Sequence, residues 1–196
     1  MMQALKVLIV PLWLTVAIAI ACIKRAAEEV PHPPMHYTYL NDLEVKANEY
    51  SHVDIDGNGS PDFTFHTMLV GDPILKRDKH QFLVGSKIET SLLNDNNDQS
   101  PKLNNGDQID LRQERYNWFE ISSLLLTEKV VSEEGSIKWQ GLWKEANHNY
   151  LPVQIIKNGQ RFLGWIEISF DLKNQKLILH KSAVCLESNK EIRAGY

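Results

Sequence analysis

The chain has 196 residues, of which 43% are hydrophobic and 23% charged, and its formal net charge is −4 at pH 7. This balance is typical of a globular protein, and it excludes the strongly basic surface on which nucleic-acid binding depends. We therefore expect no nucleic-acid partner. The two cysteines are too few for a disulfide framework, and the length corresponds to one domain able to bury a core without one.

The N-terminus has the composition of an export signal. Lys6 supplies a positive charge ahead of an apolar run over residues 7–21, which is short for a membrane-spanning helix of about 20 residues. A charged start, an apolar centre and small residues at the end are the marks of a cleaved leader. We therefore predict a signal peptide over residues 1–21.

Cys22 directly follows the small residues of this leader, in Ala19-Ile20-Ala21-Cys22. The arrangement resembles the bacterial lipobox, which is cleaved before a cysteine whose thiol then carries lipid such as palmitate. Lipidation at Cys22 implies attachment to the cell envelope, with the outer membrane of a Gram-negative bacterium as the expected location. Ala19 stands where leucine is more usual. Ordinary secretory cleavage after Ala19 or Ala21 is therefore the main alternative, and an uncleaved anchor is a weaker one.

Residues 22–36 are predicted to form a flexible tether. Polar residues follow Cys22, and Pro31-His32-Pro33-Pro34 can neither continue a helix nor pair as a central strand. A proline-rich spacer holds a folded domain away from a membrane surface. The folded domain is then expected to occupy residues 37–196.

The strongest chemical signal in the chain is the run Asp54-Ile55-Asp56-Gly57-Asn58-Gly59-Ser60-Pro61-Asp62. It places side-chain oxygens at positions 1, 3, 5 and 9 and a glycine at position 6. This spacing suits calcium, which takes about six to eight oxygen ligands. We predict a structural calcium site with Asp54, Asp56, Asn58 and Asp62 as ligands, in which the cation offsets the repulsion among the carboxylates.

The run nevertheless departs from an EF-hand, because position 12 is Phe65 rather than a bidentate glutamate. The calcium affinity is therefore expected to be weak, with a Kd of about 10⁻⁴ to 10⁻³ M. A solvated Asx-turn without metal is the alternative interpretation, since Asp, Asn and Gly also dominate ordinary turns. The run from Asn94 to Asp98 lacks the glycine and the closing acid, and we expect a simple loop there.

From Tyr37 onward the sequence alternates between apolar and polar residues in short runs. The clearest runs cover residues 62–68, 87–92, 136–143, 163–170 and 176–180. Such alternation predicts half-buried antiparallel strands, and Asn158-Gly159 between two apolar runs predicts a hairpin from Leu151 onward. Residues 120–129 fit either a short helix or a strand. The sequence therefore predicts an all-β fold, an antiparallel β-sandwich of jelly-roll or lectin-like type.

Several of these stretches resemble one family. Residues 53–65 resemble the D-x-D-G-D-G-x-x-D-F segment of uncharacterised secreted lipoproteins of Bacteroidetes, and also the calcium loops of FG-GAP and thrombospondin type 3 repeats. Residues 150–153 and 163–166 are similar to the Y-L-G-V and Y-G-W-I motifs of those lipoproteins, with Pro152 and Leu163 in place of glycine and tyrosine. The resemblance implies an all-β extracytoplasmic domain. It carries over no catalytic residue, because the family has no established activity.

No catalytic arrangement is evident in the sequence. Seven histidines are dispersed along the chain, and no Gly-x-Ser-x-Gly elbow is present. Glu167 alternates outward in a predicted strand, but glycoside hydrolysis requires a pair of carboxylates. Cys185 lies among apolar residues and is expected to be a buried, inert thiol.

Three tryptophans, Trp139, Trp143 and Trp165, are candidates for stacking against a ligand such as a sugar ring. Core packing is the competing use, because large aromatic side chains dominate the burial of apolar area. Trp139 and Trp143 are four residues apart and would share one face of a strand. That face is either a ligand platform or part of the core.

These features favour a lipid-anchored cell-envelope protein with a calcium-stabilised β-sandwich. Its role would be to bind an unidentified glycan or protein ligand, or to be structural, and it would contact the membrane through the N-terminal lipid. The alternative is a carbohydrate-active hydrolase or lyase of the bacterial cell surface. That alternative requires two facing carboxylates beside the tryptophans.

Overall fold

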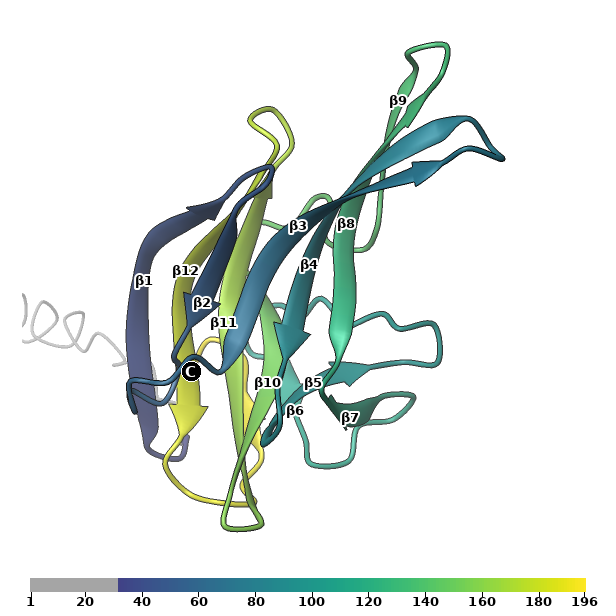
Figure 1. The fold of residues 1–196 in the computed structure, drawn as a ribbon. Coiled ribbons are helices and arrows are strands. Elements are labelled where there is room, and N and C mark those ends of the chain that lie inside the picture. Colours follow the sequence, from purple (N-terminus) through teal and green to yellow (C-terminus); the bar gives the residue numbers. More distant parts are fainter. Residues whose placement is uncertain (1–31) are drawn as a thin grey trace, which may run out of the picture. The chain divides into compact units, whose positions relative to one another are not determined.

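Residues 32–196 are described by the computed structural model, and they form two large antiparallel β-sheets without helices (Figure 1). The predicted signal peptide, Cys22 and most of the predicted tether lie outside the described residues. Within residues 32–196 there is no helix long and apolar enough to cross a membrane. The prediction of an all-β antiparallel sandwich is confirmed.

The larger sheet has six strands in the order β1-β12-β11-β10-β5-β7. These strands are β1 (Met35–Val45), β12 (Lys176–Cys185), β11 (Gln160–Asp171), β10 (Asn149–Lys157), β5 (Thr90–Asn94) and β7 (Asn117–Glu120). β1 begins two residues before the predicted start of the domain, because Met35 already pairs with Cys185 on β12. Strands β10, β11 and β12 follow one another along the chain, so simple hairpins build the centre of this sheet.

The second sheet has five strands in the order β2-β3-β4-β8-β9. These are β2 (Tyr50–Val53), β3 (Phe63–Asp72), β4 (Arg77–Ser86), β8 (Ser123–Ser132) and β9 (Ile137–Gln140). Most of the segment 120–129, which fitted either a helix or a strand, is therefore strand. The far ends of the β3–β4 and β8–β9 hairpins extend beyond the sandwich (Figure 1). A short additional sheet pairs β6 (Gln108–Ile109) with β13 (Ile192–Arg193).

The predicted hairpin at Asn158-Gly159 is present between β10 and β11. The two strands pair without interruption up to Lys157 and Gln160. Asn158 and Gly159 form the connection with φ values of +52° and +74°, as the type I′ turn requires. Asn and Gly adopt positive φ at the lowest cost, so these two residues fix the register of the hairpin and the position of Lys157.

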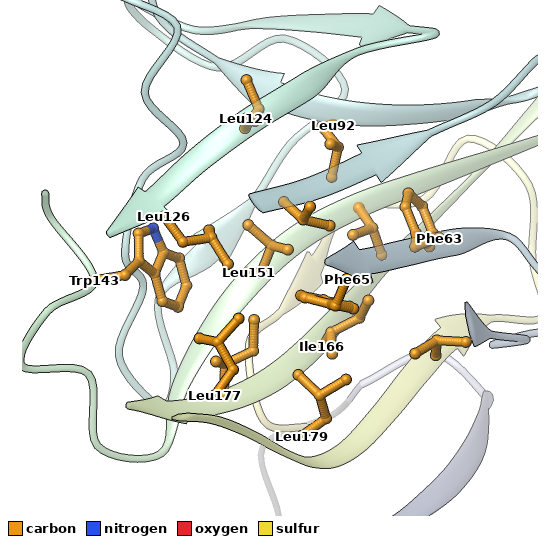
Figure 2. Close-up of a cluster of buried hydrophobic side chains, with 14 of the residues drawn as sticks. Phe63, Phe65, Leu92, Leu124, Leu126, Trp143, Leu151, Ile166, Leu177 and Leu179 are labelled. Atoms are coloured by element: carbon orange, nitrogen blue, oxygen red, sulfur yellow. The ribbon is translucent and has the colours of Figure 1, made fainter. Parts of the chain in front are cut away.

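The main core lies between the two large sheets (Figure 2). Phe63 and Phe65 of β3 contribute from one sheet, and Ile166 and Ile168 of β11 from the other. Within each pair, one residue stands between the two buried side chains. The alternation of apolar and polar residues in the sequence therefore matches the alternation of side chains that point into and away from the core. Full burial of a side chain of this size contributes on the order of 1.5–3 kcal/mol relative to exposure.

A second, smaller core covers part of the opposite face of the six-stranded sheet. It contains Trp165 of β11 and Cys185 of β12, which pack with Ile109 of β6 and Ile192 of β13. The predicted burial of Cys185 is confirmed, and burial raises the pKa of its thiol. The six-stranded sheet is therefore buried on both faces along part of its length.

The buried positions of the tryptophans correct the interpretation that they form a ligand platform. Trp143 lies in the main core and Trp165 in the second core, and each is 1% exposed. Trp139 is partly buried and packs edge-on against Phe170, with ring centroids 5.1 Å apart. Core packing therefore takes up Trp143 and Trp165 completely, and neither offers a ring face to a sugar.

Candidate metal centre

The acidic loop, defined as residues 54–62, connects β2 to β3. Its base is closed by the pairing of Val53 with Phe63 and by a hydrogen bond from Asp62 N to Val53 O of 2.8 Å. Gly57 and Gly59 have φ values of +72° and +84°, a conformation that side chains with a Cβ adopt at a cost. The two glycines thus let the loop curl tightly around its own carboxylates.

Three of the four predicted ligands come together in this loop. Asp54, Asp56 and Asp62 each offer a carboxylate oxygen within 4.8 Å of the others. Asp54 accepts hydrogen bonds from Gly57 N at 2.8 Å and Gly59 N at 2.7 Å. An ionised carboxylate has about four lone-pair sites, so these bonds orient Asp54 and still leave sites for a cation.

Asn58, the fourth predicted ligand, has its side-chain oxygen turned toward the backbone. Asn58 Oδ1 accepts a hydrogen bond from Ser60 N at 2.7 Å, while Asn58 N donates to Asp56 Oδ1 at 3.1 Å. These are the contacts of an Asx-turn. Coordination by Asn58 would use the second lone pair of Oδ1, and this role stays a prediction.

Asp62 is the buried member of the group, with 4% of its surface exposed. Its Oδ2 accepts a hydrogen bond from Ile55 N at 2.9 Å. Burial, together with the charges of Asp56 and Asp54, raises the pKa of Asp62 above its ordinary value despite that hydrogen bond. The folded protein therefore holds this carboxylate in an environment that disfavours its negative charge.

The ammonium group of Lys157 lies beside the acidic loop. The sequence alone did not identify this residue as part of the site. Its Nζ lies 2.7 Å from Asp56 Oδ2, and the Asp56 side chain is only 3% exposed. Although the two atoms are at ion-pair distance, Oδ2 makes no hydrogen bond of normal geometry with any described residue. Burial raises the pKa of Asp56, but the contact with Lys157 and the Asn58 N–H outweigh it, and the pKa lies below its ordinary value.

This ion pair joins the two sheets of the sandwich. The acidic loop belongs to the five-stranded sheet, whereas Lys157 ends β10 in the six-stranded sheet. The contact of Lys157 with Asp56 depends on how the two sheets pack, so no local pattern in the sequence could have identified it. The acidic loop therefore lies at a junction between the sheets and not only between two neighbouring strands.

Glu167, the outward-facing glutamate of the sequence analysis, is not part of the acidic loop. It lies on β11, and its Oε1 is 2.7 Å from His148 Nδ1. The structure thus gives Glu167 an imidazole partner rather than the second carboxylate of a glycosidase pair.

Comparison of this chain with protein-family models, with curated proteins and with solved structures finds no match. The resemblance to Bacteroidetes lipoproteins therefore stays a prediction. The fold and the site define an antiparallel β-sandwich with a tri-aspartate loop at the junction of its sheets.

Proposed function

We propose that this protein is a lipid-anchored component of the cell envelope whose β-sandwich is stabilised by one calcium ion in the acidic loop. Its role is to bind a ligand at the cell surface or to be structural. The observation that carries the calcium proposal is the convergence of three carboxylates, one of them buried, on one point.

The donor set suits calcium better than other common cations. Calcium takes only oxygen ligands and tolerates irregular geometry, whereas magnesium demands a near-ideal octahedron and retains several waters. Asp54, Asp56 and Asp62 supply carboxylate oxygens on an irregular loop with no nitrogen or sulfur donor. The hydrogen bonds from Gly57 N and Gly59 N hold Asp54 in place, so binding requires little rearrangement.

A bound calcium ion would stabilise the acidic loop at the junction of the two sheets. It would neutralise the charge that now rests on buried Asp62 and on Asp56. In its absence Lys157 supplies part of that compensation from the other sheet. Calcium is therefore a stabiliser of the fold that takes over the charge compensation from Lys157, and the weak affinity suits a calcium-rich exterior.

The start of the folded domain lies next to the acidic loop. The backbone of Gly57 contacts the imidazole of His36 near the start of β1, where an added Cβ would be 3.1 Å from Nε2. The ten residues from Cys22 to His32 span at most roughly 35 Å when extended. A lipid on Cys22 would therefore tether the sandwich to the membrane by the end that carries the acidic loop.

Metabolic labelling with a palmitate analogue tests the anchor. The wild-type protein should be labelled and the Cys22→Ala variant should not. Cys185→Ala is the matched control, because that thiol is buried in the second core and its loss should leave labelling unchanged. Equal labelling of wild type and Cys22→Ala would show that the anchor is wrongly assigned.

Thermal unfolding with calcium and with chelator tests the metal site. At about 10 mM calcium, a Kd of about 10⁻⁴ to 10⁻³ M gives a stabilisation of about 1.4–2.7 kcal/mol. The corresponding rise in Tm is about 3–10 °C. Asp54→Asn should lose this rise. Asp95→Asn should keep it, because Asp95 forms a similar turn with Asn97 N and Gln99 N outside the acidic loop.

A carbohydrate-active role is the second candidate, and the aromatic residues of β1 favour it. Tyr39 is 72% exposed, and the ammonium of Lys181 lies 4.1 Å from the ring centroid of Tyr37 nearby on the same strand. An exposed aromatic ring beside a cation suits stacking on a sugar that carries an acidic group. Glycan-array binding that is lost in Tyr39→Ala would favour this role, and an array without binding would remove it.

A further inference from the structure

Five polar side chains gather on the face of the six-stranded sheet that is opposite to the main core. We define the His180 cluster as Asp42 of β1, His148 just before β10, Glu167 and Ser169 of β11, and His180 of β12. Ile168 and Phe170 of β11 point into the main core, so alternation turns Glu167 and Ser169 to the other side.

Two irregularities in strand pairing meet at His180. The pairing of β1 with β12 shifts register between Tyr39 and Leu43, and the pairing of β11 with β12 shifts between Glu167 and Ile168. Asn41 and Asp42 both have φ of +54° in the first of these. Bulges redirect side chains and are frequent beside active sites. Here they bring Asp42 and Ser169 to the two nitrogens of one imidazole.

Ser169, His180 and Asp42 form a continuous chain of hydrogen bonds. Ser169 Oγ lies 2.8 Å from His180 Nε2, and His180 Nδ1 lies 2.5 Å from Asp42 Oδ1. A neutral imidazole satisfies both contacts when Nδ1–H donates to the carboxylate and Nε2 accepts from the hydroxyl. This is the relation of nucleophile, base and orienting acid by which a catalytic triad is recognised, whatever the fold or chain order.

His148 and Glu167 hold this chain in place. The rings of His148 and His180 are stacked, with centroids 4.2 Å apart and planes at 23°. Glu167 Oε1 lies 2.7 Å from His148 Nδ1 and fixes the stacked ring. The backbone N–H of His148 donates to Ser169 Oγ at 2.9 Å. The nucleophile and the base are therefore each positioned by two contacts.

The reactive groups line a hollow of a size suitable for a small molecule. Ser169, His180 and His148 border a space of about 440 Å³ together with Phe170, Ile178 and Lys144, and small-molecule sites measure about 300–1,000 Å³. Ile178 provides apolar contact, whereas the ring of Phe170 lies in the main core. Lys144 adds a positive charge to the lining, 4.0 Å from Glu145, and the lining also includes Glu145 and Asp171.

We propose that this hollow hydrolyses short-chain carboxylic esters, with Ser169 as nucleophile, His180 as general base and Asp42 as the residue that positions His180. Ser169 Oγ attacks the ester carbonyl carbon as its proton passes to His180 Nε2. The carbon–oxygen bond to the alcohol then breaks, and the alcohol leaves with that proton. Water, deprotonated by His180, releases the acid and restores Ser169. The activity does not depend on the acidic loop.

A fluorophosphonate probe, which reacts with activated serines, tests the assignment on the purified mature protein. Mass spectrometry should locate the adduct on Ser169, and Ser169→Ala should not be labelled. His180→Asn should slow hydrolysis of p-nitrophenyl acetate by about 10²- to 10⁴-fold. Asp42→Asn should lower kcat and leave KM unchanged, because Asp42 acts only through His180.

A matched control is His52→Ala on the other sheet. His52 Nδ1 also contacts a hydroxyl, Thr64 Oγ1 at 2.9 Å, but no carboxylate among residues 32–196 hydrogen-bonds to its ring. Its loss should leave both labelling and hydrolysis unchanged. The proposal is overturned if the folded wild type is not labelled, if the adduct lies on another residue, or if Asp42→Asn, whose side chain is 75% exposed, melts as wild type and keeps full activity.

Discussion

Asp62 is the residue on which the calcium site depends most. Its carboxylate is buried and close to two like charges. Replacement by asparagine keeps an oxygen for the Ile55 N–H but removes the buried charge. We predict that Asp62→Asn is as stable as wild type in chelator, or more stable by up to about 1 kcal/mol, since an unpaired buried charge is costly. It should gain nothing from calcium, and a retained gain in denaturant titrations would argue against Asp62 as a ligand.

The raised pKa of Asp62 predicts a pH dependence with a definite sign. An acid whose folded pKa lies above its ordinary value of 3.8 contributes stability that is present below that value and lost as the pH rises through the folded pKa. In chelator, wild type should therefore lose stability relative to Asp62→Asn as the pH rises from 3.8 through the raised folded pKa of Asp62. Saturating calcium should reverse this trend, because it binds the ionised carboxylate of wild type and cannot stabilise the variant. Parallel pH profiles of the two proteins in chelator would contradict the assigned environment.

Lys157 and calcium compete for the same charge in this account. Lys157→Met should destabilise the protein in chelator by about 1 kcal/mol, a modest cost because the lysine is half exposed. The same change should tighten calcium binding, since it removes a positive charge next to Asp56. Lys173→Met, in the turn between β11 and β12, is the control. Weaker calcium binding by Lys157→Met would contradict this competition.

At the scale of the elements, two strand glycines differ in the space around them. A Cβ on Gly164 of β11 would lie 2.5 Å from Ala183 O on β12, whereas one on Gly71 of β3 would meet only Asp78 Oδ1 at 3.6 Å. We predict that Gly164→Ala costs about 1–3 kcal/mol through strain in the centre of the sheet. Gly71→Ala should change the free energy of unfolding by less than about 0.5 kcal/mol. Equal effects in urea titrations would contradict the close approach of β11 and β12.

The strands could be predicted because each leaves a local pattern. Alternation identified most of β3 and β11 and the first half of β12, and Asn158-Gly159 identified the β10–β11 turn. The second core could not be predicted, since it joins residues as distant in sequence as Ile109, Trp165 and Ile192. A strand buried on both faces shows the same aromatic content as one with an exposed aromatic face, so the sequence could not decide between core packing and ligand stacking for Trp165.

The candidate sites also differ in how much of each could be predicted from local sequence. The acidic loop is local, so its three carboxylates were found from spacing alone, whereas Lys157 reaches it from the opposite sheet. The His180 cluster depends on bulges in two strand pairs. Neither Asp42 nor Ser169 carries a motif in its own neighbourhood, so only the assembled sheet brings them together.

At the scale of the whole molecule, the acidic loop, the start of β1 and Lys157 meet at one end of the sandwich. The His180 cluster lies elsewhere, on the outer face of the six-stranded sheet. This separation means that calcium should change stability without changing ester hydrolysis, and Ser169→Ala should change hydrolysis without changing the calcium response. The two proposals can therefore succeed or fail independently.

The central claim, that the acidic loop binds calcium, is tested most directly by a calcium titration followed in the amide NMR spectrum. The signals of Gly57 N–H and Gly59 N–H should shift and saturate with a Kd of about 10⁻⁴ to 10⁻³ M, with Lys157 as the main responder outside the loop. Magnesium should produce smaller changes. If these two amide signals stay in place up to about 10 mM calcium, roughly tenfold above the weakest expected Kd, the acidic loop is a solvated turn and the claim is wrong.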